Sequence, residues 1–304
     1  MDYRTLNLQF IAVYKVAFFV FGTIGNLLFI HLIVRKKQLQ SRTSILQCFQ
    51  CFFHLFCQLG TLLDGVFEIG NKLNRSECFD RIGFYVFFQA AQGLIMVIIV
   101  LDILVFVKFT TLYRNLSSLK YTIFTATPII LFSFATAFYG WLSRNDNWIP
   151  SCSPPFIFDT SASILYKYIF IFFSLLVLIL YIILIRAFYQ RSQSSCQIFQ
   201  KTIKRLQLSV VIYIATWFFS QIFGLIVLRV TEYSVGGGMI FAHNSLFICL
   251  SYSNTFYVTM WRSKEYRDQF YSVWCPKLVR ISTIPVIHVS LISPKSTVTD
   301  RRRT

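Results

Sequence analysis

The chain has 304 residues, of which 56% are hydrophobic, 18% aromatic and only 13% charged. A soluble domain carries about 25% charged residues because its surface must be wetted, so this composition excludes an ordinary soluble protein and indicates a membrane protein. The net charge of +17 would suggest nucleic-acid binding in a soluble chain, but here the basic residues form short clusters between apolar stretches. We therefore expect the lipid bilayer, and no nucleic acid, as a partner.

Seven apolar segments follow one another along the chain, and each is long enough for a helix to cross a bilayer, which takes about 20 residues. They begin near Gln9, Ser44, Phe84, Tyr121, Ser163, Leu206 and Gly238 and end near Val34, Glu68, Val107, Trp141, Ile185, Arg229 and Trp261. The sequence predicts an all-α membrane protein whose seven-transmembrane helix bundle occupies residues 1–275. Within that domain, the amphipathic residues 265–270 suit the membrane interface, and residues 276–304 are expected to form a disordered cytoplasmic tail.

The Lys and Arg residues are divided unevenly between the two sides of the predicted bundle. Most of the 29 lie in the first, third and fifth connections and in the tail, whereas those on the other side are matched by Asp and Glu. Cytoplasmic loops of membrane proteins are enriched in Lys and Arg, so the tail is predicted to be cytoplasmic and the N-terminus extracellular. We expect a multi-pass protein of the plasma membrane.

Two of the eight cysteines differ from the others, most of which lie inside predicted spans as small buried hydrophobes. Cys78, at the start of the third span, and Cys152, in the second outer connection, both face the side where a disulfide can form and persist. A bridge between them would tie that connection to the third helix, and two unpaired thiols are the alternative. Asn74 begins an Asn-Arg-Ser glycosylation sequon in an outer connection, whose occupancy the sequence leaves open.

A candidate ligand pocket lies in the outer halves of three predicted helices. Tyr85 and Gln89 share one face of the third helix, Trp217 and Gln221 share one face of the sixth, and His243 lies on the seventh. The sequence places no carboxylate on the third helix near Tyr85, which disfavours an amine ligand, and the outer connections have no net charge to attract an ion. We expect a neutral or weakly polar small molecule there, with plain helix packing as the alternative.

Polar residues in the cytoplasmic halves form a second candidate group. Asn26, His54 and Ser253 fall at similar depth on three helices, where they form either a hydrated switch cluster or structural hydrogen bonds between helices. The sequence offers no nucleophile–base pair, metal-ligand cluster or phosphate-binding loop, so we expect no enzyme, no cofactor and no metal. A transporter or ligand-gated channel remains an alternative, although only Lys15 and Pro128 hint at its charges or broken helices, and they do not pair up.

Several short motifs, together with their spacing, resemble one receptor family over about residues 9–272. They are Gly25-Asn26, Arg35-Lys36-Lys37, residues 41–46, Leu101-Asp102 at the expected distance after Cys78, Phe256-Tyr257 and residues 261–267. The chain resembles the nematode serpentine receptors of class sx (Srsx), chemoreceptors of the rhodopsin-like G-protein-coupled receptor superfamily. The resemblance implies a short eighth helix, a small-molecule ligand and a heterotrimeric G protein as partners, and a chemosensory function.

The same resemblance singles out residues for switching and coupling, and shows where this chain departs from the pattern. Ile103 replaces the arginine that usually follows the acid of the third span, here Asp102, while His54 stands for a second-span aspartate and Ser253-Asn254 for an Asn-Pro pair. These changes leave a non-coupling pseudoreceptor as an alternative. The remaining candidates for contact with a G protein or with anionic lipid headgroups are Tyr113, Lys201, Lys204, Arg205 and Tyr257.

Overall fold

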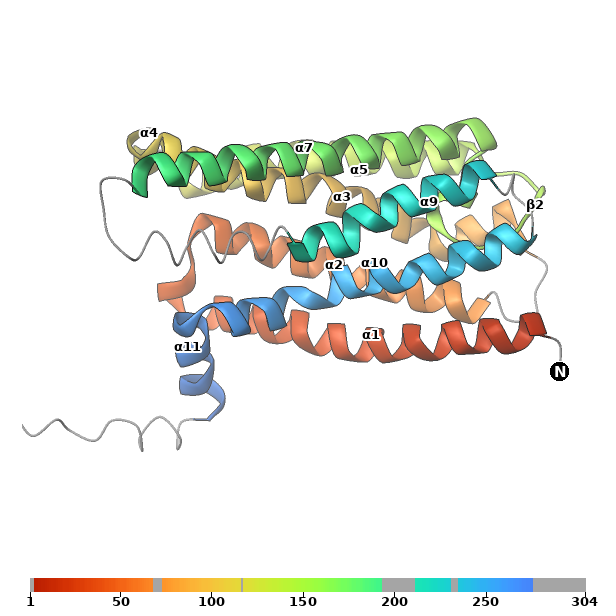
Figure 1. Cartoon of the computed structure of the whole chain (residues 1–304), viewed down its shortest axis with the longest axis horizontal. Helices are drawn as coiled ribbons and strands as arrows, with labels where there is room; N and C mark the ends of the chain where they lie inside the picture. Colours follow the sequence, from red (N-terminus) through yellow and green to blue (C-terminus); the bar gives the residue numbers. More distant parts are fainter. Residues whose placement is uncertain (1–2, 68–72, 116, 193–210, 231–234, 276–304) are drawn as a thin grey trace, which may run out of the picture.

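The computed structural model describes residues 3–67, 73–115, 117–192, 211–230 and 235–275. Long helices run side by side in one elongated bundle (Figure 1). They are α1 (Tyr3–Arg35), α2 (Arg42–Phe67), α3 (Arg75–Lys108), α5 (Ser118–Leu142), α7 (Thr160–Ser192), α9 (Phe219–Val230) and α10 (Val235–Arg262). The shorter elements are η1 (Lys37–Leu39), β1 (Leu73–Asn74), α4 (Thr110–Asn115), β2 (Trp148–Ile149), α6 (Pro154–Ile157), the π-helical turn η2 (Ile214–Phe218) and α11 (Lys264–Trp274).

Six of these helical segments have the length and apolar composition needed to cross a membrane. They are Thr5–Arg35, Arg42–Phe67, Arg75–Lys108, Lys120–Leu142, Thr160–Gln190 and Val211–Val230. The seventh long helix, α10, is 28 residues long but more polar, and it packs within the bundle against α1, α2 and α9. The predicted seven-helix bundle is therefore confirmed, while the predicted bounds near Glu68 and Leu206 lie outside the described residues.

Helix α3 lies at the centre of the bundle and is the most deeply buried of the spans. It packs against α2, α5 and α7, while α1 packs against α2 and α10. It begins at Arg75 rather than near Phe84, because the helix continues beyond its apolar stretch to reach β1 and Cys78. Large apolar side chains such as Phe10, Phe124 and Phe134 remain exposed on the outer helices, as expected where a protein surface faces lipid.

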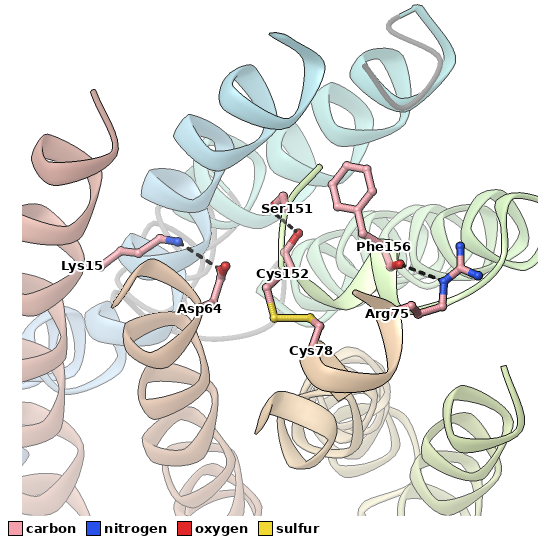
Figure 2. The surroundings of a disulfide bond; sticks show 8 residues. Lys15, Asp64, Arg75, Cys78, Ser151, Cys152 and Phe156 are labelled. Carbon is pink, nitrogen blue, oxygen red and sulfur yellow. Dashed lines mark hydrogen bonds and ion pairs between the residues drawn. A yellow bond between two sulfur atoms is a disulfide. The ribbon is translucent and has the colours of Figure 1, made fainter. Parts of the chain in front are cut away.

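One end of the bundle, here called the disulfide end, carries the N-terminus and both strands (Figure 1). Cys78 and Cys152 form a disulfide there with their Cα atoms 5.5 Å apart, which confirms the predicted bridge (Figure 2). β1 pairs antiparallel with β2, so that Leu73 lies opposite Ile149. Arg75 Nε also donates a hydrogen bond to the Phe156 carbonyl at 3.5 Å, and together these contacts fix the loop that follows β2 onto α3.

The opposite end, here called the α11 end, carries α4 and α11 (Figure 1). The side chain of Ser263 caps α11 by accepting a hydrogen bond from the Tyr266 backbone N–H. Tyr266 and Phe270 pack against α1 and the end of α10, with the Tyr266 ring 6.1 Å from that of Phe29. The predicted amphipathic stretch is therefore a short helix, and it extends to Trp274.

We expect Cys78→Ser to lower the free energy of unfolding by about 2–5 kcal/mol, because the bridge closes a long loop in the unfolded chain. The two cysteines are 74 residues apart in sequence. Thermal unfolding of the purified protein in one detergent would measure the loss. The double variant Cys78→Ser/Cys152→Ser should lose no more than either single variant, and a fully additive loss would contradict the bond.

Candidate functional site

A small cavity lies beneath the loop at the disulfide end, in the interior of the bundle. Its roof is formed by Ser151 and Ser153 of this loop and by Pro154 and Pro155 at the start of α6, and its walls by α2, α3, α7 and α10. Its volume is about 20 Å³, room for about one water molecule, so a ligand would have to enlarge it. The polar and aromatic side chains on its walls are Asp64, Tyr85, Gln89, Lys167, Phe241 and Ser245.

Tyr85 and Gln89, predicted from their shared helix face, both line this cavity. Gln89 Oε1 accepts a hydrogen bond of 2.8 Å from the Tyr166 hydroxyl, which joins α3 to α7. The Tyr85 ring lies directly over Gly60 of α2, where an added Cβ would be only 2.3 Å from it. Glycine at position 60 therefore allows Tyr85 to take its place in the wall.

The two predicted residues of the sixth span do not line the cavity, although both are buried. Trp217 belongs to the π-helical turn η2, and its ring lies 6.1 Å from that of Phe170 and 6.0 Å from that of Tyr252. Gln221 Oε1 accepts a hydrogen bond of 3.3 Å from Lys167 Nζ. Gln221 therefore reaches the cavity only through Lys167.

The assignment of His243 to the pocket is wrong. Its side chain is exposed, and its Nε2 lies 2.9 Å from Oδ1 of Asn7 on α1. The inward face of α10 presents Phe241, Ser245 and Ile248 to the cavity. Successive side chains along a helix are rotated by about 100° around its axis. The prediction placed His243 at the right depth in the bundle but on the wrong face of α10.

A buried ion pair borders the cavity, and it was missed in the sequence. Lys15 Nζ of α1 lies 3.0 Å from Asp64 Oδ2 of α2, and both side chains are almost fully buried (Figure 2). The lysine stem passes Gly65, where an added Cβ would lie 2.6 Å from Lys15 Cδ. The sequence did contain a signal for this pair, since Lys15 and Asp64 are opposite charges in neighbouring predicted spans. Charged groups within a membrane usually pair with one another.

A second buried lysine lies on the other side of the cavity. Lys167 of α7 has 1% of its surface exposed, and its ammonium lies 5.2 Å from the centre of the Phe241 ring. Gly224 of α9 leaves the space for it, since a Cβ there would lie 3.1 Å from Lys167 Nζ. Sequence reasoning also missed this residue, because it lies near the start of an otherwise apolar span.

The three polar residues predicted to lie at similar depth do come together, between α1, α2 and α10. Asn26 Nδ2 donates to the Tyr252 carbonyl at 3.0 Å, and the His54 ring lies 5.3 Å from the Tyr252 ring. Ser253 Oγ accepts a hydrogen bond of 3.1 Å from Gln58 Nε2. The three helices are thus joined by polar contacts around one turn of α10.

A cluster at the α11 end surrounds the carboxylate of Asp102, which is buried. This carboxylate accepts hydrogen bonds from the hydroxyls of Thr43 on α2 and Tyr121 on α5, the latter at 2.6 Å. The Arg42 guanidinium lies 4.5 Å from the centre of the Tyr113 ring and donates to the Tyr113 carbonyl. Burial, with Asp102 nearby, raises the pKa of Tyr113 to about 12, so its hydroxyl stays protonated at neutral pH.

The other switch and coupling candidates are divided between the interior and the surface. Asn254 lines an open cavity of about 130 Å³ with Tyr181, Tyr213 and Arg262. Tyr257 does not face this cavity: its ring stacks on Phe21 at 4.0 Å. Lys201, Lys204 and Arg205 lie outside the described residues. Asn74 is half-buried at the end of β1.

The family model of the serpentine type 7TM GPCR chemoreceptor Srsx matches residues 19–274. The chain belongs to this family. The resemblance drawn from the sequence motifs is confirmed, and the protein is a multi-pass membrane protein of the GPCR type. No curated protein matches the chain significantly.

Within this Srsx receptor, Ile103 occupies an apolar environment. It is partly buried and packs against the cluster that contains Leu46, Ile99 and Ile129. The neighbouring carboxylate of Asp102 is instead held by hydroxyl groups of α2 and α5, and the nearby cation is Arg42. Asp102 therefore has polar partners although the residue after it is apolar.

We expect Lys15→Met or Asp64→Asn to destabilise the Srsx receptor by about 3–5 kcal/mol, because each leaves a buried polar partner without its counter-charge. The double variant Lys15→Met/Asp64→Leu should lose less than either single one, since it removes both charges. Thermal unfolding in detergent would report these differences.

The matched control is the exposed ion pair at the same end, in which Arg144 Nη1 lies 2.8 Å from Asp80 Oδ1. Asp80→Asn should change the stability by less than about 1 kcal/mol, since exposed pairs contribute little. If the buried and the exposed pair lose the same unfolding free energy, burial does not determine how much an ion pair stabilises this protein.

Proposed function

We propose that the protein is a chemosensory G-protein-coupled receptor that binds a small molecule in the cavity at the disulfide end. The observation that carries this proposal is the cavity's construction: four helices supply polar and aromatic walls, and a loop fixed by Cys78–Cys152 closes it. A site for a small ligand is typically concave and mostly apolar, with a few well-placed polar groups. Membership of the Srsx family supports a receptor of this kind.

The proposed orientation has the N-terminus and the disulfide end outside the cell and α11 in the cytoplasm. A disulfide forms and persists in an oxidising compartment, which supports this orientation. The concentration of Lys and Arg in the connections of the α11 end and in residues 276–304 supports it as well. Residues 276–304, which lie outside the described part of the chain, are proposed to be a cytoplasmic tail.

The proposed route for signalling runs through the sixth span to a heterotrimeric G protein. Trp217 and Tyr252 lie in contact between the two cavities: Ile248 lines the roofed one, while Thr216 and Ser251 line the open one. The π-helical turn at Trp217 is a local irregularity of the kind often found at functional sites. A ligand that moves α9 would thereby alter the open cavity at the α11 end.

Two alternatives remain for the experiment to separate. The Lys15–Asp64 pair is an intramembrane charge pair of the kind that transporters use, so ligand-dependent current or uptake without a G protein would favour that function. Because Ile103 replaces the family's arginine, binding without a second-messenger response would favour a pseudoreceptor. A small-molecule screen in cells that express the chain, read by both second messengers and current, distinguishes the three.

The location of the ligand can be tested with any agonist that this screen provides. Gln89→Ala should reduce its potency roughly threefold to tenfold, the effect of one hydrogen bond, while surface expression is maintained. His243→Ala is the control, since His243 faces away from the cavity and should leave the potency unchanged. A potency loss confined to His243→Ala would place the ligand elsewhere.

The orientation predicts the accessibility of epitope tags at the two ends of the chain. Antibodies should reach an N-terminal tag on intact cells, and a C-terminal tag only after permeabilisation, because the tail is cytoplasmic. Immunofluorescence with and without detergent measures this. Staining of the C-terminal tag on intact cells would overturn the orientation, and with it the proposed ligand-binding end.

A further inference from the structure

Two buried lysines, Lys167 on the cavity wall and Lys15 behind Asp64, differ in their partners. Lys15 forms an ion pair with Asp64 at 3.0 Å. Lys167 is equally buried, yet among the described residues no carboxylate oxygen lies within 4.0 Å of its ammonium nitrogen. Its ammonium donates a long hydrogen bond of 3.3 Å to Gln221 Oε1. The cavity wall therefore carries one amine group that has no carboxylate partner among the described residues.

The groups around Lys167 are also incompletely satisfied. Gln221 and Asn244 are almost fully buried, and within the described part of the chain Gln221 Nε2 and Asn244 Oδ1 have no hydrogen-bond partner. An ammonium group has three donors, and an amide has two donors and an acceptor. Buried polar groups without partners destabilise a structure, and a bound ligand is one way to supply the missing partners.

Resting on the proposed function, we infer that the ligand is a small monocarboxylate with an apolar body. Its carboxylate would accept a hydrogen bond from Lys167 Nζ, which lines the cavity. Its body would contact Tyr85, Phe241 and Ile248, which supply the apolar part of the cavity wall. Sequence reasoning favoured a neutral ligand because it considered the charge of the connections and not the charge inside the bundle.

The arrangement of charges excludes other ligand classes. A phosphate monoester would bring close to two negative charges to one ammonium, with the Asp64 carboxylate on the same cavity wall. A zwitterionic amino acid would need a carboxylate for its own ammonium, but Asp64 already holds Lys15. A neutral ligand would give the buried Lys167 amine no counter-charge, whereas a carboxylate would stabilise its protonated form.

The test compares acids with their uncharged analogues on the purified full-length receptor. The probes are benzoate, phenylacetate, hexanoate and octanoate, each with its primary amide and methyl ester, and the readout is the thermal unfolding midpoint over a concentration series. We expect at least one acid to raise the midpoint. Its amide and ester should need roughly tenfold to hundredfold higher concentrations, because they lose a hydrogen bond to a charged group.

Lys167→Met tests the residue itself. The ligand-free variant should unfold at a higher temperature than the wild type, because it no longer buries a polar amine, and it should lose the shift caused by the acid. Arg229→Gln is the matched control: Arg229 lies near the end of α9, contacts the Tyr168 hydroxyl at 2.9 Å and does not line the cavity. Arg229→Gln should retain the acid-induced shift. This result would show that the acid needs a basic group at position 167, and that removing a basic residue elsewhere has no effect.

Three outcomes overturn the inference. They are amides or esters that act at the same concentrations as the acids, an acid-induced shift that survives in Lys167→Met, and a complete lack of response to all four acids. In the first case the binding cavity and the proposed receptor function stand while the carboxylate is rejected. In the last case the proposed function is judged separately, by the cell-based screen.

Discussion

The hydrocarbon core of a bilayer offers polar groups no water, so each polar side chain between the helices depends on a partner inside the protein. Lys15 meets Asp64, Asn26 meets the Tyr252 carbonyl, and Gln58 meets Ser253. All three contacts join α1, α2 and α10. These helices form a side of the bundle held by directional bonds, whereas α7 contacts η2 largely through apolar rings such as Phe170 and Trp217. Rings of this kind can shift past one another without breaking a hydrogen bond.

This division would let the proposed ligand site at one end affect the other end of the bundle. The roofed cavity and the open cavity of the α11 end share no lining residue, but Trp217 and Tyr252 lie between them. Tyr252 belongs to the hydrogen-bonded side, whereas Trp217 itself packs through rings, although α9 is joined to α7 by the Lys167–Gln221 bond and to α10 by the bond from Asn244 Nδ2 to the Ser220 carbonyl. A movement of the sixth span would therefore be transmitted through the contact between Trp217 and Tyr252, while α1, α2 and α10 keep their relative positions.

The sequence predicted the elements of the fold well, because hydropathy and charge act on whole segments. The disulfide followed from two cysteines expected on the same face of the membrane, and the structure brings Cys78 and Cys152 together. Individual side chains were harder to place. The prediction for His243 failed on helical phase, and the Lys15–Asp64 pair depends on which faces of α1 and α2 meet, which only packing decides. Lys167 was overlooked because it lies near the start of an apolar segment. A single charge there looks like a residue at the membrane surface and not like one inside the bundle.

The roof of the cavity is held on two sides. Cys152 bonds it to α3, and Pro150 lies so close to α10 that a Cβ at Gly238 would be 2.8 Å from the Pro150 carbonyl oxygen. A loop fixed in this way cannot swing open like a lid, so entry and exit depend on the slower separation of helices. For the ligand that we propose, this favours a long residence time in the cavity. Such a sensor averages the concentration of its ligand over time and does not follow brief pulses.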